Sequence, residues 1–188
     1  MKNALLKQYH ALAPDWMDIG LRHETKKTAE PYFCTPKGAE IFASLGVDGV
    51  HYCTIAKCGE TVFVIRPSDE PYVLPVANNF EDFLRVVLAL HGTNILDQLP
   101  IFSREKAEAY LKKQIESETE EAKAALRALA EAFSLTPMED PLDYVASVAN
   151  SFDMRKIQFT AEYYDVLGLE ENETQGNDFV STIAIIKK

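Results

Sequence analysis

The chain is poor in glycine and has no long apolar run, and each shortage excludes a class of protein. Its eight glycines form neither a Gly-x-Gly-x-x-Gly turn nor a Walker loop, and no Gly-x-Ser-x-Gly or His-Glu-x-x-His motif is present. No apolar stretch reaches the roughly 20 residues that a membrane-spanning helix needs. The sequence therefore predicts no membrane segment and no cofactor.

The cysteine content and the N-terminus both indicate a reducing compartment. Three cysteines in 188 residues, an odd number, do not make a disulfide framework. The opening MKNALLK lacks the continuous apolar core and the small-residue cleavage site of a secretory signal. We therefore expect a cytoplasmic protein.

Basic side chains are also scarce, with 19 Lys and Arg against 29 Asp and Glu, which gives a net charge of −10. The range 157–186 contains six carboxylates and no Lys or Arg. Such a surface repels phosphate backbones, so we expect no binding to nucleic acid. It attracts a basic protein partner instead. The alternative is that the acidity only keeps the protein soluble, and composition does not separate the two.

Three strands are predicted in series in the middle of the chain. The ranges 50–56, 61–65 and 72–76 are rich in β-branched and aromatic residues, which favour strands. Their connections are too short for crossover helices, so the strands form an antiparallel meander. Pro71 and Pro75 place the third strand at an edge of the sheet or in irregular pairing.

Helices are predicted on both sides of the meander from apolar residues three and four apart. They cover 5–12, 35–45, 79–91, about 103–134 and 141–149, while 20–31 is a predicted loop and 179–186 a closing strand. Thr35 as the N-cap and Pro36 at the first helical position define the start of the second helix. We expect one α+β domain over 1–188, with an antiparallel sheet flanked by helices and a C-terminal extension over 138–188.

His51, Cys53 and Cys58 are the first candidates for a chemical site. On a strand, His51 and Cys53 point to the same face, about 6.6 Å apart along the strand axis. With Cys58 from the hairpin they supply three zinc ligands or a Cys–His nucleophile pair. No Cys-x-x-Cys pair or fourth ligand accompanies them, and a buried Cys commonly acts as a small apolar side chain. A metal-binding protein or a small enzyme therefore stays as the alternative.

Adjacent carboxylates do not indicate acid–base catalysis in this chain. Glu81 and Asp82 diverge on a helix, and their place at its start is explained by the helix dipole. Asp69 and Glu70 occupy a predicted turn, where Asp is common. The sequence predicts no catalytic residue.

Three segments carry a resemblance: Gly46-Val-Asp-Gly-Val-His-Tyr-Cys, the strand pair up to Ile65-Arg-Pro, and Val76-Ala-Asn-Asn-Phe-Glu-Asp-Phe-Leu. Together they resemble the SUKH superfamily, which includes the Smi/Knr type of glucan-synthesis regulators, and the best-matched core is 35–100. The resemblance implies an antiparallel sheet flanked by helices. It also implies that the chain is either an immunity protein against a nuclease or deaminase toxin, as many bacterial members are, or an intracellular interaction module.

Charge and resemblance together predict a non-enzymatic protein-binding domain. The expected mechanism is occlusion, in which acidic and aromatic side chains cover the basic active-site cleft of a toxin. The expected contact residues lie at predicted strand ends: Asp48, Glu60, Asp69, Glu70 and Tyr72. A regulatory scaffold of the cell-wall-synthesis type is a further alternative.

Overall fold

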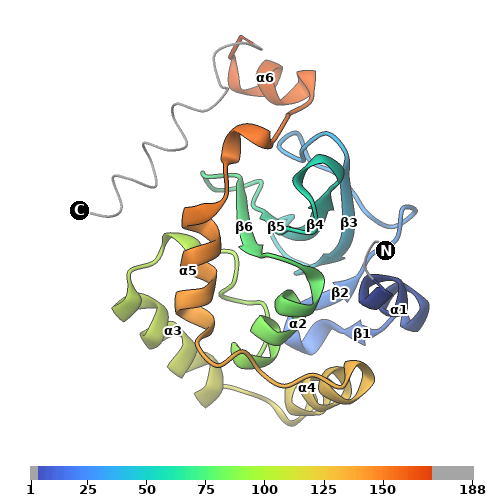
Figure 1. Ribbon diagram of the computed structural model, residues 1–188, viewed down its shortest axis with the longest axis vertical. Coiled ribbons are helices and arrows are strands. Elements are labelled where there is room, and N and C mark those ends of the chain that lie inside the picture. The colour runs from blue at the N-terminus through green and yellow to red at the C-terminus, as the bar shows by residue number, and fades with distance from the viewer. Residues whose placement is uncertain (1–3, 171–188) are drawn as a thin grey trace.

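The computed structural model describes residues 4–170, and within them it confirms the α+β class (Figure 1). Six strands form one antiparallel sheet in which each strand pairs with its neighbour in sequence. The strands are β1 (Asp15–Trp16), β2 (Leu21–His23), β3 (Ala39–Ser44), β4 (His51–Ile55), β5 (Val62–Ile65) and β6 (Val73–Ala77). The predicted three-strand meander is β4–β5–β6, and β6 is an edge strand.

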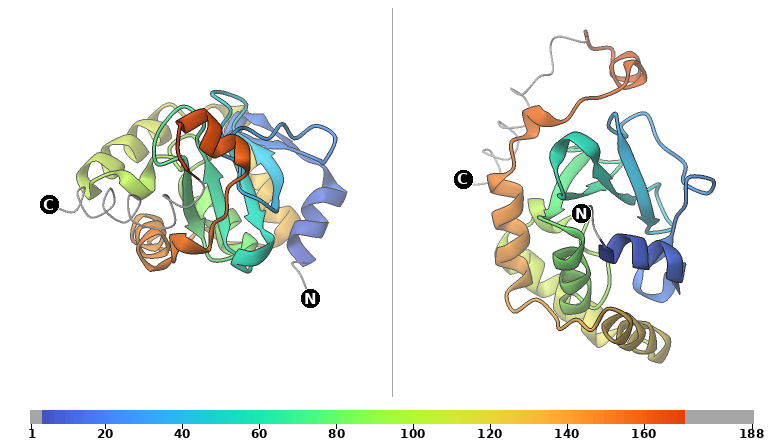
Figure 2. Two further views of the ribbon diagram at one scale, coloured as in Figure 1. Left: turned by 90° about the horizontal axis from the view of Figure 1, so that it is seen from above. Right: turned by 45° about the vertical axis from the view of Figure 1, so that its right-hand side comes forward.

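Six α-helices accompany the sheet within the same residues: α1 (Ala4–Leu12), α2 (Phe80–Ala89), α3 (Arg104–Glu116), α4 (Glu120–Phe133), α5 (Pro141–Ser151) and α6 (Ala161–Leu167). Short 3₁₀ turns lie at Met17–Ile19, Ala56–Cys58, Leu99–Ile101 and Met154–Lys156. Helix α5 runs beside β6, and α1 lies next to α2 (Figure 2). Each of the helices in the described part of the chain is too short or too polar to cross a bilayer.

Apolar side chains cover both faces of the sheet, because alternate residues of a strand point to opposite sides. In β4, Tyr52 joins a large cluster with Phe42, Phe80 and the buried side of α1. The neighbouring Cys53 joins a smaller cluster on the other face, which segments 31–36 and 152–163 cover. This two-sided burial explains why β5 and β6 read as continuous apolar runs rather than alternating ones.

The helix predicted over 35–45 is wrong, because this segment contains strand β3. Thr35 caps no helix: its hydroxyl accepts a hydrogen bond from the backbone N–H of Tyr32. Ile41 and Phe42 are adjacent and pack in different clusters on opposite faces of the sheet, as the alternation of a strand requires. The bulge between Ile41 and Ala43 instead lets the neighbours Phe42 and Ala43 join the same large cluster. Two neighbouring apolar residues therefore imitated one face of a helix. The predicted loop over 20–31 likewise contains β2.

The single long helix predicted from Ser103 is two helices, α3 and α4. Ser103 caps α3 as expected, but Thr119 caps a new helix, with its hydroxyl accepting from the N–H of Ala122 at 3.1 Å. Between them, the carboxylate of Glu118 bonds His91 Nδ1 at 2.7 Å. This tether and the competing cap break the helix in its charged middle.

Several other predictions of helix ends are confirmed. Asn79 caps α2, because its side-chain oxygen accepts from the N–H of Asp82 at 2.9 Å. Pro141 occupies the first position of α5, and α1 ends at Leu12 before Pro14. The strand predicted over 179–186 lies outside the described residues.

Candidate functional site

One end of the sheet carries two hollows on either side of a single loop. The β3–β4 loop (45–50) and the β5–β6 loop (66–72) lie at this end, because alternate connections of a meander share an end. The histidine hollow, of about 260 Å³, is lined by Arg22, Glu24, Thr28–Glu30, Tyr32, Ile41, Ser44 and 46–51. The arginine hollow, of about 250 Å³, is lined by Leu45, Val47, Asp48, Val50, Arg66, Ser68, Asp69, Asn94, Asp97 and Gln98.

The loop between the hollows has a backbone conformation that depends on glycine at position 49. Gly49 has φ +68°, and a Cβ atom there would lie 2.5 Å from Cζ of Tyr32. Asp48, directly before it, also adopts a positive φ of 52°, which Asp tolerates better than most residues. The N–H of Val50 bonds the carbonyl of Val47 at 3.1 Å. The turn therefore pushes Val47 and Asp48 outward between the two hollows.

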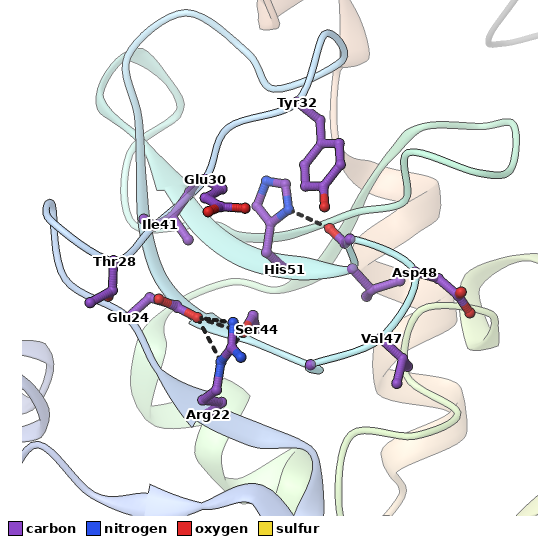
Figure 3. Close-up of a pocket in the computed structure, with 14 residues that line it drawn as sticks. Arg22, Glu24, Thr28, Glu30, Tyr32, Ile41, Ser44, Val47, Asp48 and His51 are labelled. Carbon is purple, nitrogen blue, oxygen red and sulfur yellow. Dashed lines mark hydrogen bonds and ion pairs between the residues drawn. The ribbon is translucent and has the colours of Figure 1, made fainter.

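His51 fixes this loop to the β2–β3 connection (Figure 3). Its Nδ1 donates to the carbonyl of Gly49 at 2.7 Å, and its Nε2 lies 3.3 Å from the hydroxyl of Thr35. The ring of Tyr32 stacks on the imidazole, with 5.9 Å between centroids. Burial lowers the pKa of His51 below its ordinary value of 6.5, against the opposing effects of the Gly49 carbonyl and Glu24. The imidazole is therefore neutral and structural at neutral pH.

A buried carboxylate forms part of the wall of the histidine hollow. Glu24 is 3% exposed, and its Oε1 accepts from Ser44 at 2.7 Å and from Arg22 Nε at 2.9 Å. Burial alone would raise the pKa of Glu24. Hydrogen bonds from Ser44, Thr28 and Arg22 outweigh this effect and bring the pKa below its ordinary value. The wall therefore contains an ionised carboxylate that is paired with Arg22, whose side chain is half exposed.

The arginine hollow contains a poorly satisfied buried ion pair. Arg66 and Asp97 are only 4% and 7% exposed, and their closest atoms, Nε and Oδ2, are 3.8 Å apart. Arg66 Nε and Nη1 and Asp97 Oδ1 have no hydrogen-bond partner. Burial raises the pKa of Asp97, while the charge of Arg66 opposes the rise. Such a pair is costly to bury, so it marks this hollow as a candidate site.

Exposed apolar side chains gather around the same loop. Seven large apolar residues are exposed in the described part of the chain, and three of them are Met17, Tyr32 and Val47. Val47 is 57% exposed at the tip of the loop, and Met17 Cε lies 3.6 Å from the position of a Cβ at Gly46. The two hollows around these side chains are lined by five carboxylates against two guanidinium groups. Apolar anchors within a charged rim are typical of a protein-binding surface.

The structure brings some of the predicted contact residues together and separates others. Asp48 and Asp69 line the arginine hollow. Glu70 is exposed in the same β5–β6 loop, where it accepts a hydrogen bond from the Tyr72 hydroxyl at 3.2 Å. The Tyr72 ring packs against Phe33 at 5.3 Å rather than standing free.

Glu60 lies at the opposite end of the sheet from the other four residues. It follows β4 in the β4–β5 connection, whereas the two hollows lie beyond the His51–Ile65 pair at the other end of those strands. Glu60 lines a separate cavity of about 400 Å³ beneath α1. The five predicted residues therefore do not form one surface.

The side chains of His51, Cys53 and Cys58 are not arranged as a set of metal ligands or as a Cys–His nucleophile pair. Both cysteines are buried free thiols in the smaller apolar cluster, whereas the two nitrogens of His51 face Gly49 and Thr35. Burial raises the pKa values of Cys53 and Cys58, which disfavours the thiolate that binds metal or attacks substrate. Within residues 4–170, no three His, Cys, Asp or Glu side chains converge as metal ligands.

Comparison of the chain with protein-family models, with curated proteins and with solved structures gave no match. The geometry of the two hollows is therefore what identifies the candidate site. Sequence reasoning missed Arg66, Asp97 and Val47. A signal existed for Arg66, a single charge at the end of the apolar run of β5, and for Val47, an apolar residue beside two turn glycines. The pairing of Arg66 with Asp97 had no signal in the sequence.

Because His51 is neutral in the folded protein, the stability of the fold should depend on pH. Because its pKa is lowered in the folded state, the unfolded chain binds the extra proton first, and stability is lost as pH falls below 6.5 through the folded pKa. We expect the urea midpoint of the wild type to fall more between pH 7.5 and pH 5 than that of His51→Asn. His23, whose pKa is also lowered, is present in both proteins, so the difference isolates His51. Parallel pH profiles would contradict a neutral, structural His51.

Proposed function

We propose that this protein is a non-enzymatic binding protein that holds a basic protein partner against the loop 46–49 and its two hollows. The observation that carries the proposal is the arrangement of exposed Met17, Tyr32 and Val47 among five carboxylates at one end of the sheet. The carboxylates increase the rate of encounter with a positive surface, while the apolar side chains, once desolvated, slow dissociation. The proposal places this binding in the cytoplasm, and the three free cysteines are compatible with a reducing compartment.

Within this proposal, the partner is a toxin and the protein is its immunity protein. The resemblance to the SUKH superfamily supports this reading, because the loop Gly46-Val-Asp-Gly that carries part of the resemblance also forms the ridge between the hollows. The mechanism is occlusion: the acidic end of the sheet covers the basic cleft in which a nuclease or deaminase toxin binds its substrate. No bond is made or broken by the protein itself.

The proposal predicts an association rate that depends on salt and on particular carboxylates. We expect the rate constant for binding the toxin domain encoded beside this gene to fall at least about tenfold when ionic strength rises from about 20 mM to about 300 mM. Asp48→Asn should lower the low-salt rate roughly twofold to fivefold. Val47→Ala should instead raise the dissociation rate, because it truncates an anchor. Stopped-flow fluorescence measures both constants.

Glu60→Gln is the matched control, since it also removes an exposed carboxylate, but at the other end of the sheet. Its association rate should equal that of the wild type. A rate that ignores salt, or an equal loss in Glu60→Gln and Asp48→Asn, would contradict the proposed surface. A neighbouring gene with no toxin domain would contradict the immunity role.

A further inference from the structure

The arginine hollow contains more negative charge than its own guanidinium can neutralise. Asp48, Asp69 and Asp97 line it from three different connections, and Arg66 is the single basic residue among its lining residues. Arg66 Nη2 lies 3.7 Å from Asp69, and its Nε lies 3.8 Å from Asp97. Both contacts exceed hydrogen-bond length. Arg66 therefore donates no hydrogen bond to Asp69 or Asp97.

The orphaned atoms of this pair distinguish the hollow from an ordinary acidic patch. Asp97 is 7% exposed, and its Oδ1 accepts no hydrogen bond. A buried carboxylate oxygen that accepts no hydrogen bond is expensive in a low-dielectric setting. Asp69, in contrast, keeps 71% of its side chain exposed at the mouth of the hollow. A second positive group entering at Asp69 would offset the negative charge of the hollow that Arg66 does not neutralise.

The origin of the acceptors in separate segments favours an ammonium group over a guanidinium group. An ammonium group has three donors that diverge in space, whereas a guanidinium fork needs two acceptors side by side. Here the carboxylates come from the β3–β4 loop, the β5–β6 loop and the segment after α2, so they line the hollow from three separate segments. Ser68 and Asn94, which also line the hollow, are neutral residues with a side-chain oxygen acceptor each. A slender, strongly hydrated point charge fits this set best.

We propose that the arginine hollow receives one lysine ammonium group of the protein partner. The inference rests on the proposed function and assigns one specific contact to it. Asp69 meets the ammonium at the mouth, and Asp48 and Asp97 hold it from the two sides. Arg66 keeps Asp97 charged and in place, and its own positive charge limits the hollow to a single added cation.

Nuclear magnetic resonance titration of the full chain with N-acetyl-lysine methylamide tests this contact without the partner. We expect saturable shifts of backbone amides in 45–50, 66–69 and 94–98, with affinity in the millimolar range that a single charged side chain allows. The isosteric N-acetyl-norleucine methylamide should produce none. The arginine analogue should bind more weakly.

Two variants locate the site within the hollow. Asp69→Asn, at an exposed position, should weaken lysine binding at least about threefold, whereas Glu60→Gln should leave it unchanged. Asp97→Asn should weaken it as well, and if that variant does not fold, Asp69→Asn decides. Shifts that norleucine reproduces, tighter binding of arginine, or full affinity in Asp69→Asn would overturn the inference. If the toxin still binds in a salt-dependent manner under those outcomes, the proposed function stands and only the lysine contact fails.

Discussion

Phe80→Ala is expected to lower the free energy of unfolding by about 3–5 kcal/mol. Phe80 is fully buried at the first position of α2, directly after the cap Asn79. Its ring contacts three others edge-on or stacked: Tyr9 of α1 at 5.4 Å, Phe42 of β3 at 5.1 Å and Phe83 at 6.0 Å between centroids. Removing it leaves a cavity where α1, α2 and the sheet meet. These aromatic neighbours cannot all relax into that space.

Urea titration followed by circular dichroism measures this loss, and two substitutions calibrate it. Phe80→Leu keeps most of the volume and should cost clearly less. Tyr110→Ala removes an aromatic ring that is 41% exposed on α3, and should change stability by about 0.5 kcal/mol or less. A loss below about 1 kcal/mol in Phe80→Ala would show that the cluster around α1 and α2 does not hold the sheet.

The parts of the fold that could be predicted from sequence are those with a local cause. β-Branched runs specified β4 and β5, and Asn79 and Ser103 specified the starts of two helices through bonds to backbone three residues ahead. The misassigned segment, 35–45, had a cause that is not local. Phe42 is buried on one face and Ile41 is partly buried on the other, and only the elements covering both faces of β3 make that favourable.

The residues of the candidate site likewise fall into two groups, those that local features predict and those that only the tertiary fold brings together. Asp48 and Asp69 were predicted as contact residues because they are acidic and lie at the ends of predicted strands, and both of these features are local. The exposure of Val47 and Met17 could not be predicted, since an apolar side chain is exposed only when no other segment covers it. Asp97 follows α2 and meets Arg66 through the tertiary fold alone. The geometry that makes this end of the sheet a site is therefore tertiary, although several of its residues were predicted from the sequence.

The Arg66–Asp97 pair gives the second large effect. Arg66→Met alone should lower the free energy of unfolding by about 3–5 kcal/mol, because it leaves Asp97 buried without a counter-charge. The double variant Arg66→Met/Asp97→Leu should recover this loss and match or exceed the wild type, by up to about 4 kcal/mol. The reason is that the native pair is held at 3.8 Å with orphaned atoms on both partners, so it returns little of its desolvation cost. A double-mutant cycle in urea measures the coupling.

Binding and stability should then separate in the double variant. It should be stable and yet bind the lysine probe and the toxin partner more weakly, because the net charge of the hollow is unchanged while one of the three carboxylates that hold the ammonium is gone. Arg104→Met, which removes an exposed guanidinium paired with Glu108 and Asp143, is the control and should leave both properties nearly unchanged. A double variant that stays several kcal/mol below the wild type would show that the pair stabilises the fold itself. The buried charges would then be explained by folding, and their cost would no longer support a binding site in the arginine hollow.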